Sequence, residues 1–221
     1  MTQKKSEFLV FLFSPYVISA FVAIMAIGVF TSSGLPLTHQ FAMSQQQQQQ
    51  QPQGPNELTY TNNKDGFTLR YPSSWTVLGE NSFGTSVSLI PPNSNNSGDG
   101  FFAIITRYFD PKDALDLDTY SQGELNLLLD AYRGNFDPQQ YPNAEFLELS
   151  TVRIAGHLGL KAVLTYDHPM HGEMKISEIQ IPVGERQFVI DYGSKPDMFN
   201  SLANDSESII KSLMILPTYD K

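Results

Sequence analysis

The stretch GFTLRYPSSW, residues 66–75, is a short run of strand-forming residues that ends at a proline and a tryptophan. Its apolar and polar residues alternate, and a period of two is typical of a strand with one buried and one wet face. The residues expected to face the core are Phe67, Leu69 and Tyr71. Thr68 and Arg70 are then expected to face water. Pro72 should end the strand because it cannot donate to a ladder, and Trp75 should close one end of the core.

Strand-like segments lie on both sides of this stretch. ELTYT (57–61) and the turn NNKDG (62–66) predict a hairpin with it. TSVSLIPP (85–92) alternates in the same way. FFAIITRYF (101–109) is a longer apolar run, as a central strand requires.

A first helix is expected within residues 117–133. Asp118 or Thr119 would cap its start, and Gly134 would mark its end. The expected apolar stripe consists of Leu117, Tyr120, Leu125, Leu128 and Tyr132.

Four strand-like runs follow, joined by turns short enough for antiparallel hairpins. They are EFLELSTVRIA (145–155), LKAVLTYDH (160–168), EMKISEIQIPV (173–183) and RQFVIDYGS (186–194). Such a meander needs one face covered. Two closing helices are expected at 195–202 and 205–213, the second capped by Asn204 or Asp205, and 213–216 could return to the sheet. The order of elements predicts an α+β domain whose antiparallel sheet is flanked by helices.

The N-terminal segment differs in character from this domain. Residues 8–30 carry no charge and would form a helix about 34 Å long, enough to cross a bilayer core of about 30 Å. Lys4 and Lys5 precede it, so the rest of the chain is expected outside the cytoplasm. A membrane anchor and a cleaved signal segment both agree with this pattern. The predicted divisions are a membrane or signal segment (1–31), a disordered Gln- and Pro-rich tether (32–56) and a folded domain (57–221).

Composition narrows the classes of function. The net charge of −9 disfavours binding to nucleic acid, because an acidic surface repels phosphates. The absence of cysteine excludes disulfides, thiolate metal sites and a cysteine nucleophile. No nucleophile-elbow or phosphate-loop motif is present, and we expect neither catalysis nor a cofactor.

The segment DHPMHGE (167–173) has the most chemical character. It brings together possible zinc or copper ligands, namely Asp167, His168, His171 and Glu173. It also lies where a hairpin must turn, so a solvated hairpin tip is the alternative to a divalent metal site.

The aspartates of DPKDALDLD (110–118) do not fit an EF-hand calcium loop, because the sixth and twelfth positions counted from Asp110 hold Leu115 and Ser121. A helix N-terminus, which favours negative charge, explains them better, and weak calcium binding is the alternative. Asn95 and Asn204 each begin an N-x-S pattern and are candidate glycosylation sites.

Three stretches, in this order of elements, resemble the PsbP family and its bacterial and archaeal PsbP-like relatives. They are GFTLRYPSSW (66–75), RQFVIDYGSKPDMFN (186–200) and SIIKSLMI (208–215). The hallmark residues carried by the resemblance are Phe67, Tyr71, Pro72, Trp75 and Ser212. The resemblance covers about residues 57–217 and implies an α-β-α sandwich. It also implies a non-enzymatic, extracytoplasmic domain that docks on or helps to assemble a larger complex.

The expected function is therefore binding or assembly, with the membrane contacted through residues 8–30 and an unidentified protein as partner. Exposed aromatic residues and the loops at 93–100 and 134–143 are the candidate contact surface. An exported carrier of a ligand or metal, or a hydrolase without a readable motif, is the alternative. An enzyme should show converging polar groups with perturbed pKa values, whereas a docking module should show an apolar patch.

Overall fold

The computed structural model describes residues 56–78, 85–92, 94, 100–134, 136, 138–139 and 141–217. The predicted membrane segment 8–30, nearly all of the predicted tether and Asn95 lie outside these residues. Within the described ranges, no helix has the length and apolarity needed to span a bilayer.

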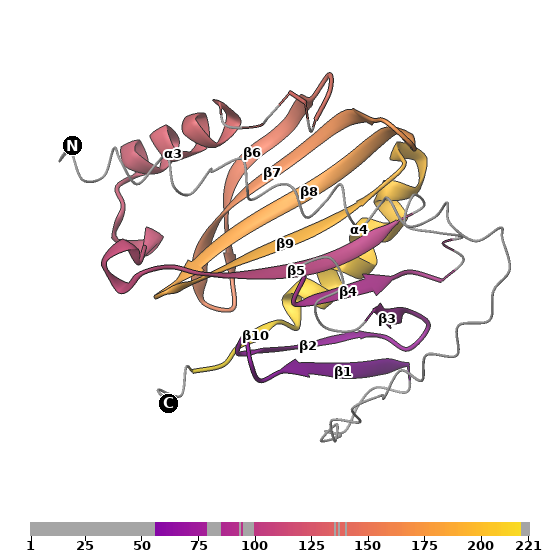
Figure 1. Cartoon of the computed structure of the whole chain (residues 1–221), viewed down its shortest axis with the longest axis horizontal. Helices are drawn as coiled ribbons and strands as arrows, with labels where there is room; N and C mark the ends of the chain where they lie inside the picture. The colour runs from indigo at the N-terminus through magenta and orange to yellow at the C-terminus, as the bar shows by residue number, and fades with distance from the viewer. Residues whose placement is uncertain are drawn as a thin grey trace, which may run out of the picture.

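The larger sheet has seven antiparallel strands among the described residues, in the order β3-β4-β5-β9-β8-β7-β6 (Figure 1). Its strands are β3 (Thr76–Leu78), β4 (Val87–Ile90), β5 (Phe101–Tyr108), β6 (Glu145–Ile154), β7 (His157–His168), β8 (Gly172–Val183) and β9 (Arg186–Ser194). The predicted four-strand meander is confirmed as β6 to β9. The predicted central strand is β5, which pairs with both β4 and β9.

The smaller sheet joins the two ends of the domain. It consists of β1 (Glu57–Asn62), β2 (Phe67–Pro72) and β10 (Met214–Ile215), with β2 in the middle. The predicted hairpin is confirmed, and its turn is closed by Gly66 at φ 71°, a conformation that favours glycine. The expected return of 213–216 to a sheet occurs here, against β2 and not against the meander.

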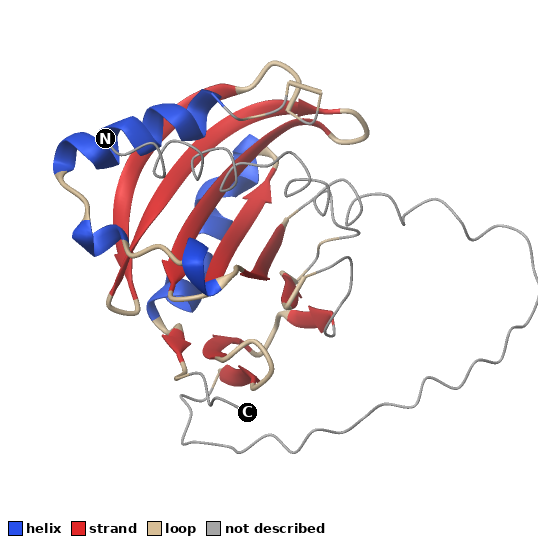
Figure 2. Cartoon of the chain, turned by 60° about the vertical axis from the view of Figure 1, so that its left-hand side comes forward, coloured by secondary structure: helices blue, strands red, loops and turns tan. Residues whose placement is uncertain are grey.

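Two α-helices cover opposite faces of the larger sheet (Figure 2). α3 (Gln122–Gly134) ends at the predicted glycine, and α4 (Pro196–Lys211) follows β9 directly. Two short 3₁₀ turns, η4 (Pro111–Asp113) and η5 (Leu117–Thr119), connect β5 to α3. The predicted α+β arrangement of an antiparallel sheet between helices is therefore confirmed for the described residues.

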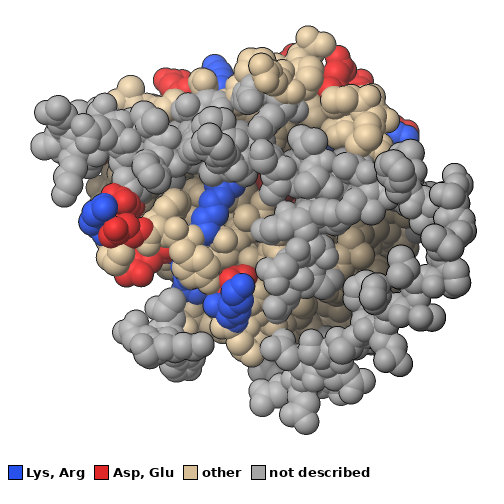
Figure 3. Space-filling model, in the orientation of Figure 1, with Lys and Arg blue, Asp and Glu red and all other residues tan. Residues whose placement is uncertain are grey.

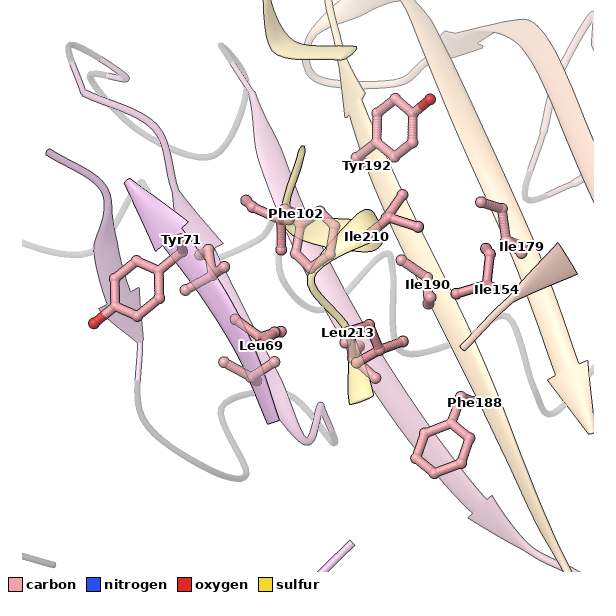
Figure 4. Close-up of a cluster of buried hydrophobic side chains, with 14 of the residues drawn as sticks. Leu69, Tyr71, Phe102, Ile154, Ile179, Phe188, Ile190, Tyr192, Ile210 and Leu213 are labelled. Atoms are coloured by element: carbon pink, nitrogen blue, oxygen red, sulfur yellow. The ribbon is translucent and has the colours of Figure 1, made fainter. Parts of the chain in front are cut away.

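Each face of the sheet has its own hydrophobic core. The cluster beneath α4 includes side chains from β2, β5, β8 and β9, and Figure 4 draws members of it on several sides of Ile210 and Leu213. The cluster beneath α3 includes Leu125, Leu128 and Tyr132 of the helix with residues of β7 and β8. Leu117 joins this cluster as predicted, whereas Tyr120 is only half-buried at its edge. The meander therefore has both faces covered, not one.

The structure corrects several local predictions. The two closing helices are one continuous helix, so Asn204 and Asp205 lie inside α4 and cap nothing. The start of α3 is capped by Ser121, whose Oγ accepts from the Glu124 N–H at 3.4 Å. The Glu124 carboxylate accepts in return from the Ser121 N–H at 3.0 Å.

Further corrections concern the opening stretch and its neighbours. Thr68, expected in water, is buried, because its Oγ1 donates to the Tyr60 carbonyl at 2.9 Å between the strands of the smaller sheet. Strand β3 was not predicted; its three residues follow Trp75 and pair with β4.

The hallmark residues have structural positions. Phe67, Tyr71 and Trp75 are at most 4% exposed and belong to the α4-side core. Pro72 is the last residue of β2, as predicted.

The Ser212 side chain makes hydrogen bonds to β2 that a neighbouring strand backbone would otherwise make. Met214 pairs with Thr68 in the β10–β2 register, which places Ser212 opposite Arg70. Its Oγ accepts from the Arg70 N–H at 2.8 Å and lies 3.1 Å from the Arg70 carbonyl oxygen. The hydroxyl thus joins the end of α4 to β2, two residues before β10 begins at Met214.

Candidate functional site

A row of polar side chains lies buried between α3 and the larger sheet. Glu178 and Gln180 on β8, and Gln187 and Asp191 on β9, are each no more than 5% exposed. Glu178 and Asp191 are direct cross-strand partners, so their side chains share one face. Successive side chains of a strand point to opposite faces of the sheet. The residues adjacent to this polar row, Ile179, Ile181, Phe188 and Ile190, face α4, so the row itself faces α3.

A chain of hydrogen bonds connects the row across three strands and the helix. Arg107 of β5 donates to Gln187 Oε1 at 3.1 Å, and Gln187 Nε2 donates to Gln180 Oε1 at 3.1 Å. Gln180 Nε2 then donates to Glu178 Oε1 at 2.7 Å. The Tyr132 hydroxyl of α3 donates to the same Glu178 oxygen at 2.5 Å. We call these residues, with Asp191 and Tyr141, the α3-side network.

Burial and mutual repulsion dominate the electrostatics of the network. The pKa of Asp191 is raised well above its ordinary value, first by burial and then by the charge of Glu178, while Arg107 acts in the opposite direction. Burial also raises the pKa values of the Tyr132 and Tyr141 hydroxyls. Burial lowers the pKa of Arg107, which the two carboxyl groups oppose. Burial and the Glu178 charge therefore favour the protonated form of Asp191.

Two atoms of the network are buried without a hydrogen-bond partner. Asp191 Oδ1 and the Tyr141 hydroxyl form no hydrogen bond within the described chain. An unsatisfied buried polar group costs about 1–3 kcal/mol, and native proteins contain few of them. The network thus combines shifted pKa values with unused hydrogen-bonding capacity, which makes it the candidate functional site of the described chain.

The structure places the predicted metal ligands at the β7–β8 turn but does not assemble all four. The rings of His168 and His171 have centroids 4.7 Å apart. His168 Nδ1 accepts from the Met170 N–H at 3.1 Å, and Asp167 accepts from the Asn143 amide at 2.7 Å. Among the residues that the structure describes, no three or more His, Asp or Glu side chains are grouped so as to hold a metal ion. Metal binding here stays a prediction.

The remaining sequence candidates lie apart from the network. Asn204 is exposed in the middle of α4, and a continuous helix is a poor setting for glycosylation because the acceptor is normally in a loop. Asp110 and Asp116 cap the two 3₁₀ turns, and Asp118 pairs with Arg153. The acidic segment therefore serves local structure.

Sequence reasoning missed the α3-side network. The alternation of Glu178 and Gln180 with isoleucines was visible, but such a pattern ordinarily indicates a wet face. The groups that satisfy the row, Arg107 and Tyr132, lie 71 and 46 residues away from Glu178 in the chain. A tyrosine in the apolar stripe of α3 was the one available signal, since a buried tyrosine hydroxyl needs a partner.

The fold is that of PsbP-like proteins. The solution structure of cyanobacterial PsbP (CyanoP) from Synechocystis sp. PCC 6803 matches with a TM-score of 0.52 at 13% identity, covering 72% of this chain and 92% of that one. The crystal structure of LpqN, involved in cell envelope biogenesis of Mycobacterium tuberculosis, matches with a TM-score of 0.52 at 14% identity, covering 73% and 91%. No protein-family model and no curated protein matches the sequence. The predicted PsbP-like fold is confirmed, and at these identities the likeness extends to the fold alone.

Proposed function

We propose that the chain is a non-catalytic binding or assembly domain that acts outside the cytoplasm, anchored to the membrane by residues 8–30. The fold shared with CyanoP and LpqN supports this proposal, as does the uncharged N-terminal segment. The hallmark residues also support it, because Trp75 and Ser212 serve packing and strand pairing and not chemistry.

The observation that carries a docking role is a pair of exposed leucines, one on the edge strand of the larger sheet and one on the helix that packs against it. β6 is the last strand of this sheet, and Leu147 lies at an irregularity in its pairing with β7. Leu147 is 50% exposed, and so is Leu127 on α3, which packs against β6. An edge strand with exposed leucines is costly in water and suited to contact with another protein.

Figure 3 shows acidic and basic side chains next to one another on the face that it draws. The ion pairs Lys161–Glu148 and Arg153–Asp118 also join opposite charges on and near the meander. We propose that the partner contacts Leu127 and Leu147, which we call the β6-edge surface.

The test is affinity capture of the full chain from its native membranes, followed by mass spectrometry. We expect a reproducible partner that Leu127→Asp or Leu147→Asp removes. Met198→Asp is the matched control, because Met198 is also an exposed apolar residue, 43% accessible, but lies on α4. Recovery of no reproducible partner, or equal recovery with all variants, would contradict the docking role.

Anchoring is tested separately by fractionation. The full chain is expected in membranes and resistant to high salt, whereas a chain without residues 8–30 is expected in the soluble fraction. Protease added outside intact cells should cleave the anchored domain. Protection of the domain in intact cells would contradict the extracytoplasmic location.

A further inference from the structure

Two polar atoms of the α3-side network are buried without a hydrogen-bond partner. Asp191 is 2% exposed and Tyr141 is 3% exposed, yet Asp191 Oδ1 and the Tyr141 hydroxyl find no partner within the described chain. Buried polar atoms almost always have a partner, either in the protein or in something bound to it. A bound ligand that satisfies this site has to form hydrogen bonds with both Asp191 Oδ1 and the Tyr141 hydroxyl.

The charges around Asp191 favour a cation. Glu178 faces it from β8, and Arg107 acts on it from β5. The neighbouring groups from α3, the α3–β6 connection and β7 are the tyrosines Tyr132, Tyr141 and Tyr166. Two carboxyl groups thus share one guanidinium, and the second negative charge has no balance unless a proton or another cation supplies it.

The aromatic side chains favour an ammonium group among cations. Tyr141 contacts Tyr166 with ring centroids 5.0 Å apart, and Phe136 lies 5.0 Å from Tyr141 and 5.2 Å from Tyr132. Aromatic rings attract ammonium groups through their quadrupoles, and a carboxylate and a phenol oxygen both accept N–H donors. A divalent metal would require more oxygen ligands than two carboxyl groups provide.

We propose that the α3-side network binds the ammonium group of a small amine between Asp191 and Tyr141. The N–H groups donate to Asp191 Oδ1 and to the Tyr141 oxygen, beside the aromatic rings. Because Asp191 must ionise to balance the incoming charge, its proton passes to solvent as the amine binds. This proposal is independent of docking at the β6-edge surface, which lies on other residues.

The test is calorimetric titration of the full chain in detergent with ethylammonium chloride. We expect saturable binding with release of about one proton, measured by repeating the titration in buffers of different ionisation enthalpy. Affinity should rise up to about tenfold per pH unit while Asp191 is protonated. Tetramethylammonium, which has no N–H donor, should bind at least about tenfold more weakly.

Variants separate the site from general effects on the fold. Asp191→Asn should abolish both binding and proton release, and Tyr141→Phe should weaken binding about tenfold. Asp197→Asn, which changes an exposed carboxylate at the start of α4, should leave binding unchanged. Circular dichroism of each variant checks that it is folded.

Some results would overturn the proposal. They are no saturable binding of ethylammonium at millimolar concentration, binding unchanged in Asp191→Asn, and equal affinity for tetramethylammonium. A carboxyl ¹³C resonance of Asp191 that does not move on titration of the wild-type chain would also overturn it, and would show that water alone serves these atoms.

Discussion

The two faces of the larger sheet are built differently from the same strands. The α4 face is mainly apolar, and its buried polar side chains in β8, β9 and α4 are Ser177, Arg186, Ser194 and Ser206. The α3 face combines an apolar layer with a row of buried carboxyl, amide and guanidinium groups. Both faces are buried, but only the α3 face carries buried carboxyl groups in the middle of β8 and β9.

The difference shows that polarity and burial are separate properties of a strand. On β9, Phe188 and Ile190 are buried by the hydrophobic effect, which needs no specific partner. Gln187 and Asp191 on the same strand are buried at a cost that only particular partners offset. The α4 face should therefore respond to loss of volume, and the α3 face to loss of a hydrogen bond or a proton.

The largest expected effect is on the α4 side. Trp75→Ala should lower the free energy of unfolding by about 3–5 kcal/mol, because it removes a large side chain that is 4% exposed. Urea denaturation measures the change. Leu127→Ala, at a half-exposed position of α3, is the control and should change stability by no more than about 0.5 kcal/mol. A loss below about 1 kcal/mol for Trp75→Ala would show that it does not close the core.

The next effect tests the α3 side. Tyr132→Phe should cost about 1.5–3 kcal/mol, because it keeps the ring but removes one of the two hydrogen bonds donated to the buried Glu178 Oε1, leaving only that from Gln180. Tyr108→Phe is the matched control: its hydroxyl donates to Asp65 at 2.9 Å, but its side chain is 56% exposed. Equal losses in the free energy of unfolding for the two variants, measured by urea denaturation, would show that burial does not increase the contribution of the Tyr132 hydrogen bond to stability.

The pH dependence of stability should also separate the faces. Because the pKa of Asp191 is raised in the folded state, folding takes up a proton above the ordinary carboxyl pKa of about 3.9. Its contribution is therefore fully present below that pH and is lost as pH rises toward the raised value, with a slope of up to about 1.4 kcal/mol per pH unit.

Asp191→Asn should remove this slope, so the stability of the variant relative to wild type should increase with pH above about 4. Urea denaturation at several pH values between about 4 and 8 gives the two curves. Parallel curves would mean that Asp191 does not hold a proton in the folded state.

The smallest expected effect concerns the link between α4 and β2. Ser212→Ala should cost about 1 kcal/mol, because the Arg70 N–H loses its acceptor at a partly wet position. Amide hydrogen exchange should report faster exchange at Arg70. Ser208→Ala, whose hydroxyl donates only to the Asn204 carbonyl of its own helix, is the control. Unchanged exchange at Arg70 would contradict the bridging role of Ser212.

The sequence predicted the fold because its strands are bounded by strong turn signals. Gly66 and the short turns of the meander set the hairpins, and the register followed from them. Local signals misled where a longer-range contact decided the outcome. Asn204 looked like a helix cap but lies in a helix held continuous by the burial of Phe199, Leu202, Ser206, Ile209 and Ile210.

The candidate site was less predictable than the fold. Glu178 and Gln180 alternate with isoleucines as residues on a wet face would, whereas Asp191 follows the apolar run Phe188 to Ile190. The burial of Glu178 and Asp191 involves contacts with α3 and β5. No local pattern records that Tyr132 reaches Glu178 across the helix–sheet interface. The segment with the most chemical appearance, residues 167–173, instead forms a turn in which two imidazoles lie together.

The smaller sheet also constrains the order in which the domain folds. β1 and β2 come first in the domain, yet β2 is completed by Ser212, which lies 142 residues beyond Arg70. Arg186 likewise donates to the carbonyl of Leu216 and to that of Asp65, 121 residues earlier. Contacts of such long sequence separation form late and slow folding. A chain delivered with its N-terminus first keeps one edge of its first hairpin open until its last residues arrive, so closure of this small sheet marks the completion of the domain.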